Sequence, residues 1–170
     1  MLKPQDLLLA FYLSGPRAQT QSAMAKDLGL SQAEISYATK RLRLAQLVMQ
    51  SSADVILPHL IEFSVHCARY NYPAVIGKEV RGIPTATLVE PLKDQVISSE
   101  GQVAWPSGQG TIRAQSLEPI HPSAPHAALA NPRMYRLLSL LDGIRVGKNR
   151  LRQIATDLLV AELRAPRTEA

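Results

Sequence analysis

The side chains best suited to chemistry lie between residues 31 and 43, where polar and small residues recur along one side of an expected helix. A glutamine can pair with the edge of adenine, a lysine with guanine, and a serine with several bases. An alanine can contact the methyl group of thymine, and a tyrosine can reach a base or a phosphate. We therefore predict readout of base edges in duplex DNA by Gln32, Ala33, Ser36, Tyr37 and Lys40.

Two short helices around a glycine turn are expected to position these side chains. Thr20 can cap the first helix, and Gly29 suits the left-handed backbone of the turn. Ser31 and Glu34 have the spacing of a capping box, which starts the second helix. An apolar stripe at helical spacing forms its inner side: Ile35, Ala38 and Leu42. This order predicts a helix-turn-helix, whose second helix enters the major groove.

Neighbouring segments complete this expected unit. A first helix is predicted from Pro4 to Tyr12, because a proline suits its first turn and Ser-Gly-Pro ends it at residues 14–16. Two short apolar runs, 45–50 and 55–58, flank a polar turn and predict a small hairpin in the position of a wing. Its tip lacks Lys and Arg, so it would hold a minor groove weakly. Phosphate contacts are predicted for Thr20, Gln21, Ser31, Arg41 and Arg43.

Residues 25–48, AKDLGLSQAEISYATKRLRLAQLV, resemble the winged helix-turn-helix regulators of bacteria, in particular the MarR-like DNA-binding domain. The resemblance lies in the N-terminal third and implies a transcriptional regulator that binds double-stranded DNA, usually as a homodimer on a two-fold symmetric site. We expect a sequence-specific, autoregulating homodimeric repressor. The alternative is a protein–protein adaptor or antitoxin-like protein that uses its helical module to bind a partner protein encoded nearby.

Composition and charge are compatible with these expectations. The chain has 170 residues, 46% of them hydrophobic, and a formal net charge of +5. Residues 1–50 carry six Lys/Arg against three Asp/Glu, and residues 131–170 carry eight against four, whereas residues 51–130 carry five against seven. Basic ends are typical of, but not specific to, nucleic-acid binding. The MLKPQD start is unlike a secretory signal, and no apolar run approaches the roughly 20 residues of a membrane span, so we expect a cytoplasmic bacterial protein.

The fold class predicted is mainly α: an N-terminal winged helix-turn-helix with a short wing, then a loop-rich region and C-terminal helices. Residues 73–130 hold seven of the twelve prolines and predict loops with a few short strands. Helices are expected at 59–72, 131–143 and 148–163. The predicted domains are a DNA-binding domain at 1–58, a helical or irregular dimerisation or partner-binding region at 59–163, and a flexible tail at 164–170.

Other chemistry finds little support. The segment 143–149 has three residues between its glycines, whereas a phosphate loop needs four, and Asn149 stands where that loop needs Ser or Thr. His66 and Cys67 are adjacent on an expected helix and point about 100° apart, so a buried Cys67 is favoured over a metal ligand. We expect no enzyme activity, cofactor or metal site. A second basic surface, or simply a solvated helix face, is predicted at Arg145, Lys148, Arg150 and Arg152.

Overall fold

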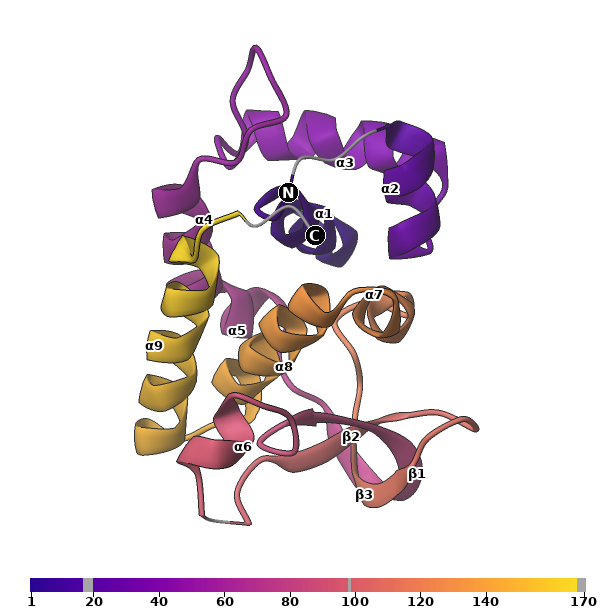
Figure 1. The fold of residues 1–170 in the computed structure, drawn as a ribbon, viewed down its shortest axis with the longest axis vertical. Coiled ribbons are helices and arrows are strands. Elements are labelled where there is room, and N and C mark those ends of the chain that lie inside the picture. Colours follow the sequence, from indigo (N-terminus) through magenta and orange to yellow (C-terminus); the bar gives the residue numbers. More distant parts are fainter. Residues whose placement is uncertain (17–19, 98, 168–170) are drawn as a thin grey trace.

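The computed structural model of this protein describes residues 1–16, 20–97 and 99–167. Figure 1 shows two N-terminal helices at one end of the molecule, a small sheet at the other, and a buried helix between them. The described helices before the sheet are α1 (Pro4–Leu13), α2 (Gln21–Leu28), α3 (Gln32–Leu44), α4 (Leu57–Glu62), the π-helical η1 (Phe63–Cys67) and α5 (Ala68–Asn71). The other elements are β1 (Ile76–Ala86), α6 (Leu92–Gln95), β2 (Gln102–Pro106), β3 (Ile112–Leu117), α7 (Ala124–Ala130), α8 (Pro132–Val146) and α9 (Asn149–Arg164).

Local capping residues fix both ends of α2 and the start of α3, as the sequence predicts. The Thr20 hydroxyl oxygen accepts a hydrogen bond from the amide of Ala23 and so starts α2. Helix α2 ends at Gly29, whose φ of 64° is the left-handed conformation favoured by glycine. Ser31 and Glu34 form the predicted reciprocal capping box at the start of α3. The expected pair of helices around a glycine turn is confirmed.

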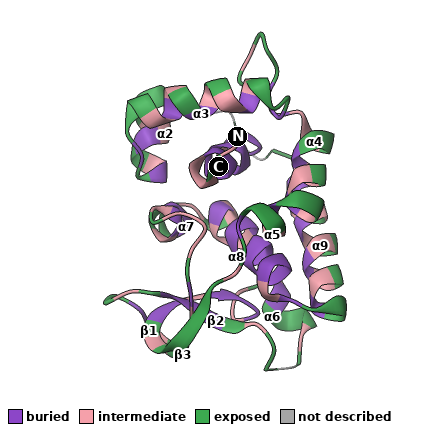
Figure 2. Cartoon of the chain, turned by 180° about the vertical axis from the view of Figure 1, so that it is seen from behind, coloured by how far each residue is buried: buried purple, intermediate pink, exposed green. Residues whose placement is uncertain are grey.

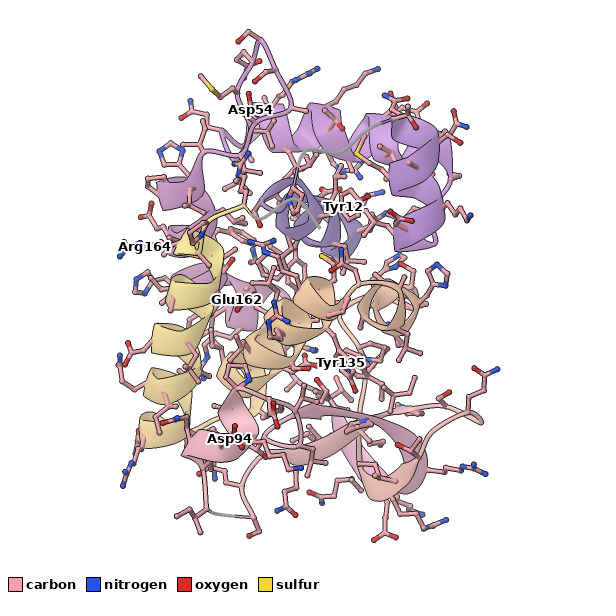
Figure 3. The ribbon with its side chains drawn as sticks, in the orientation of Figure 1. Tyr12, Asp54, Asp94, Tyr135, Glu162 and Arg164 are labelled. Carbon is pink, nitrogen blue, oxygen red and sulfur yellow. The ribbon has the colours of Figure 1, made fainter. Side chains whose placement is uncertain are left out.

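The predicted wing is wrong. Among the described residues that follow α3, the hairpin consists of one isolated bridge between Val48 and Val55, with no strand on either side. Its tip projects beyond α3 in Figure 1, and Asp54 lies in this loop in Figure 3. The Ser52 hydroxyl donates to the Asp54 carboxylate, so the polar tip is closed by its own side chains. The Met49 amide donates to the Asp54 carbonyl and the Ile56 amide to the Leu47 carbonyl, and pairing ends there because α4 begins at Leu57.

The sheet lies in the central part of the chain, where loops with a few short strands were expected, so the predicted mainly α fold class is also wrong. The molecule is mixed α/β, with β1, β2 and β3 forming a small closed mixed sheet. The C-terminal half of β1 pairs antiparallel with β2 and its N-terminal half with β3. The two halves meet at Gly82, where a Cβ atom would lie 2.4 Å from the carbonyl oxygen of Trp105. Glycine is therefore required for this close approach of backbones.

A buried polar network attaches the sheet to α8. Asp142 Oδ2 accepts hydrogen bonds of 2.8 Å from both the Thr85 hydroxyl and the Trp105 indole. Arg145 Nη1 donates to the other carboxylate oxygen at 2.6 Å, and its Nε donates to the carbonyl of Tyr72 at 2.8 Å. All these donors are matched to acceptors, which is the condition for a buried ion pair to be tolerated. The network fixes the sheet on the central helix.

One hydrophobic cluster connects the N-terminal helices with the C-terminal ones. It includes Phe11 of α1, Leu42 of α3, Leu138 of α8 and Leu159 of α9, all essentially without solvent contact. Helix α8 is buried along most of its length, as Figure 2 shows. Helix α9 continues to Arg164, the first residue of the predicted flexible tail, and residues 168–170 of that tail lie outside the described residues. Among the helices described, none has the length and apolar character needed to cross a bilayer.

Candidate nucleic-acid interface

The outer side of α3 is open to solvent and brings the five predicted base-reading residues together. Gln32, Ala33 and Lys40 are exposed, Ser36 is half-buried, and 59% of the Tyr37 surface is accessible. The ammonium group of Lys40 lies 5.6 Å from the centre of the Tyr37 ring, a cation–π contact that orders both side chains. Figure 1 shows α3 at the end of the molecule farthest from the sheet. The C-terminal half of the chain therefore does not cover this face.

The inner side of α3 is fully packed, which fixes the direction of the outer side. Ile35, Ala38 and Leu42 have no accessible surface and belong to the common core. Residues three and four apart share one face of a helix, so these three apolar residues point away from Tyr37 and Lys40. The Ser31 amide and hydroxyl donate hydrogen bonds to the Glu34 carboxylate, which hold the start of α3 in place. The same hydrogen bonds lower the pKa of Glu34. Helix α3 thus presents a defined polar face.

Arg41 has a structural role that its position in the sequence did not indicate. Its Nε and Nη2 donate to the two carboxylate oxygens of Asp6 in α1, at 2.8 and 2.7 Å. The Asp6 side chain is fully buried, and 23% of the Arg41 side chain is exposed. This bidentate pair joins α3 to α1 across 35 residues of sequence. Because two of its donor nitrogens are engaged internally, Arg41 is better described as positioning α3 than as a phosphate ligand.

The other predicted phosphate contacts differ in their availability. Thr20 and Gln21 are exposed at the start of α2, and Ser31 is exposed at the start of α3. The hydroxyl oxygens of Thr20 and Ser31 accept hydrogen bonds from backbone amides within their own helix ends. Arg43 is half-buried, and its Nε is a buried donor for which the described structure provides no acceptor. Among the described residues, the Thr20 hydroxyl, Gln21 and Arg43 therefore keep donor capacity, whereas the Ser31 hydroxyl already donates to Glu34.

The turn between α2 and α3 is supported by α7, a contact that no sequence signal indicated. His126 Nε2 lies 2.9 Å from the carbonyl oxygen of Lys26, at the end of α2. The same ring packs on Gly29, where an added Cβ would lie 3.0 Å from His126 Cδ2. Burial lowers the pKa of His121, which lies close enough to Glu34 for the carboxylate to oppose that shift. The central region of the chain thus holds the helix pair at its turn.

The predicted second basic surface is not a single surface. Arg145 is wrong as a member, because it is 8% exposed and donates to Asp142, Tyr72, Pro73 and Glu118 inside the molecule. Lys148 and Arg150 are exposed, and Arg152 is half-buried with its guanidinium group bonded to the Gly147 carbonyl. These three lie at the start of α9, at the opposite end of the molecule from α3 (Figure 1). The structure does not bring them together with the α3 face.

Metal ligands do not gather anywhere in the residues that the structure describes: no group of three His, Cys, Asp or Glu side chains is placed to hold an ion. Cys67 is exposed, so its predicted burial is wrong. The π turn of η1 places residues 66 and 67 on the outer side of the helical segment. No protein-family model, curated protein or solved structure matches this chain.

Proposed function

We propose that this protein binds double-stranded DNA through the outer face of α3 and acts as a sequence-specific transcriptional regulator. The observation that carries the proposal is an exposed, ordered row of base-reading side chains on a helix whose other side is fully packed. Helix α3 has 13 residues and is about 20 Å long. A helix of this size enters the major groove, which is about 12 Å wide.

Each side chain of this row has a proposed part in recognition. Gln32, near the start of α3, pairs with adenine, and Lys40 donates to guanine. Tyr37 lies between them and contacts a base or phosphate, and Arg43 contacts phosphate at the end of the helix. The contact between Lys40 and Tyr37 reduces the entropy lost when both side chains are fixed on DNA. We further propose that the protein is a homodimer, as the family resemblance implies, and that it acts in the cytoplasm as a repressor of its own gene.

The test begins with selection of binding sites from random duplex DNA by the full chain. Replacement of Tyr37 and Lys40 together by alanine should weaken binding to the selected site more than tenfold, because two contacts to the duplex are lost. The melting temperature should hardly change, since both side chains are exposed. Lys93→Ala is the control, because it removes the same charge from α6, beside the sheet. No selected site, or equal affinity of the double variant and the control, would contradict the proposal.

A second candidate function, binding of another protein by the same helix pair, is favoured by one observation. Large apolar side chains are exposed around the α3 face: Tyr37, Leu44 at 82% and Met49 at 48%. Affinity for random duplex DNA decides between the two functions. A DNA-binding surface loses affinity as salt rises, because cations displaced from the duplex are a part of the driving force. Affinity that is absent, or that does not fall with salt, would favour the protein partner.

A further inference from the structure

A groove of about 540 Å³ runs along the side of the molecule between α9 and the helical segment 57–71, formed by α4, η1 and α5. In Figure 1, α9 and α4 lie side by side, and the two helical segments run in opposite directions. The lining residues on α9 extend from Asn149 to Val160. At 1.5 Å per residue, the groove follows this helix for about 16 Å. Such an elongated shape suits a segment of polypeptide chain better than a compact small molecule.

The two ends of the groove differ in chemistry. Half-buried apolar side chains line one end: Ile61, Val65 and Val160. The rest of the lining contains the basic side chains His66, Arg69 and Arg152 together with four uncharged polar ones: Tyr70, Asn149, Gln153 and Thr156. Among the described residues, no carboxylate lines this groove; Asp157 lies nearby on α9 and accepts a hydrogen bond from Gln153. The groove is therefore complementary to an occupant with apolar residues at one end and acidic residues at the other.

The two arginines are held in place without an acidic partner. The Arg69 guanidinium lies 5.0 Å from the centre of the Tyr70 ring. Nε and Nη2 of Arg152 both donate to the carbonyl oxygen of Gly147, at 3.2 and 2.8 Å. Within the part of the chain that the structure describes, neither arginine forms a salt bridge. Guanidinium groups that are ordered before binding lose little entropy when they take up a carboxylate.

The π turn of η1 keeps one side of the helical segment facing this groove. Leu60, Ser64 and Ala68 are buried at intervals of four residues, which exceeds the α-helical period of 3.6. The π turn has more residues per turn than an α-helix, so residues spaced by four stay on the same side of the segment. Ile61, Val65 and Arg69 therefore all line the groove. Single π turns within helices are frequently found at functional sites. The irregular turn and the unpaired arginines thus occur at the same groove.

We propose that this groove binds an acidic, amphipathic helical segment of a partner protein. Apolar side chains of that segment pack on Ile61, Val65 and Val160, and its carboxylates bind Arg69 and Arg152. The groove shares no residue with the outer face of α3, so this inference does not rest on the proposed DNA binding. The protein can then be regulated by, or regulate, a partner without direct competition for the α3 face.

The test is selection from a displayed library of random 16-residue peptides against the full chain. Enriched peptides should combine Asp or Glu with apolar residues at intervals of three and four. Their affinity, measured by fluorescence anisotropy, should fall about tenfold in Arg69→Ala, because a charge-assisted hydrogen bond is lost. Arg69→Lys should lie between, since it keeps the charge but not the planar fork. Arg150→Ala is the matched control, because it removes an arginine from α9 that lines a different cavity, beside Gln95.

Three results would overturn the proposal. One is the absence of enriched peptides. The second is equal peptide affinity of Arg69→Ala and Arg150→Ala, with both variants keeping the melting temperature of the unchanged chain. The third is a loss of affinity for random duplex DNA in Arg69→Ala that matches the loss for peptide, which would assign the groove to the DNA backbone. Failure of the DNA-binding proposal leaves the first two readouts, peptide enrichment and peptide affinity, unaffected.

Discussion

Removal of the Asp6 carboxylate should reveal how strongly α3 is held against α1. Asp6 is fully buried, accepts two hydrogen bonds from Arg41, and accepts a third from the backbone amide of Lys3 at 2.8 Å. In Asp6→Ala the guanidinium of Arg41 keeps its charge but loses its only carboxylate among the described residues. The substitution therefore leaves a largely buried cation without a counter-ion.

The expected loss of stability depends on how far the side chains of Asp6 and Arg41 are buried. Breaking a fully buried pair costs about 3–5 kcal/mol. Because 23% of the Arg41 side chain is exposed, water can compensate part of its charge, so the lower limit of about 3 kcal/mol applies. Loss of the bond to the Lys3 amide at the start of α1 adds up to about 1 kcal/mol. For a chain of this length, such a loss lowers the melting temperature by roughly 10 °C.

Urea unfolding followed by circular dichroism measures this loss directly. Glu79→Ala is the matched control, because it breaks the Arg113–Glu79 pair, whose side chains are 68% and 63% exposed. Exposed pairs contribute about 0–1 kcal/mol, so the control should lie close to the unchanged chain. The joint replacement Asp6→Leu with Arg41→Met should recover most of the loss, since no charge is left buried. Equal destabilisation by Asp6→Ala and Glu79→Ala would show that the pair does not hold α3 in place.

Two further predictions concern the glycine turn and alkaline pH. Gly29→Ala should lower the free energy of unfolding by about 1–2 kcal/mol, because alanine is strained at a φ of 64° and its Cβ would press on His126. Gly108→Ala is the control: no atom lies within 4 Å of its added Cβ, so it should have little effect in the same urea titration. Burial, with the hydrogen bond to Asp27, raises the pKa of Tyr12 to about 12, above the usual value near 10, so its folded form retains a proton that the unfolded form loses. The contribution of the Tyr12 phenol to stability is complete below about pH 10 and is lost as pH rises toward 12. The free energy of unfolding should therefore fall less steeply over this pH range in Tyr12→Phe than in the unchanged chain. Identical slopes would contradict the raised pKa of Tyr12.

Interactions within one or two helical turns could be predicted from the sequence. Thr20, Gly29 and the Ser31–Glu34 capping box act on backbone groups three or four residues away, so their spacing alone specifies the helix ends. The outer face of α3 followed from the same periodicity. The candidate residues from Gln32 to Lys40 could therefore be placed together on the outer side of α3 from the sequence.

Interactions between distant residues could not be predicted in this way. Asp6 and Arg41 are 35 residues apart, and Thr85 reaches Asp142 across 57 residues, so no local spacing marks either pair. Short strands were expected within residues 73–130, but the 11-residue β1 was not, because it contains Gly82 and Pro84, residues that usually weaken strands. The stability of β1 depends on Trp105 of β2 and Asp142 of α8, which are distant from it in sequence. Arg145 was assigned to the surface for the same reason, since its partners come from distant segments.

The closed pairing of β1, β2 and β3 has a consequence for how this protein associates. A strand at the border of an open sheet offers a row of free amide and carbonyl groups, to which another chain can add a strand of its own. Here each of the three strands pairs with both of the others, so part of that row is already occupied. Strand addition and edge-driven aggregation are thereby disfavoured at the sheet end of the molecule. Self-association or capture of another protein is therefore expected mainly through exposed side chains.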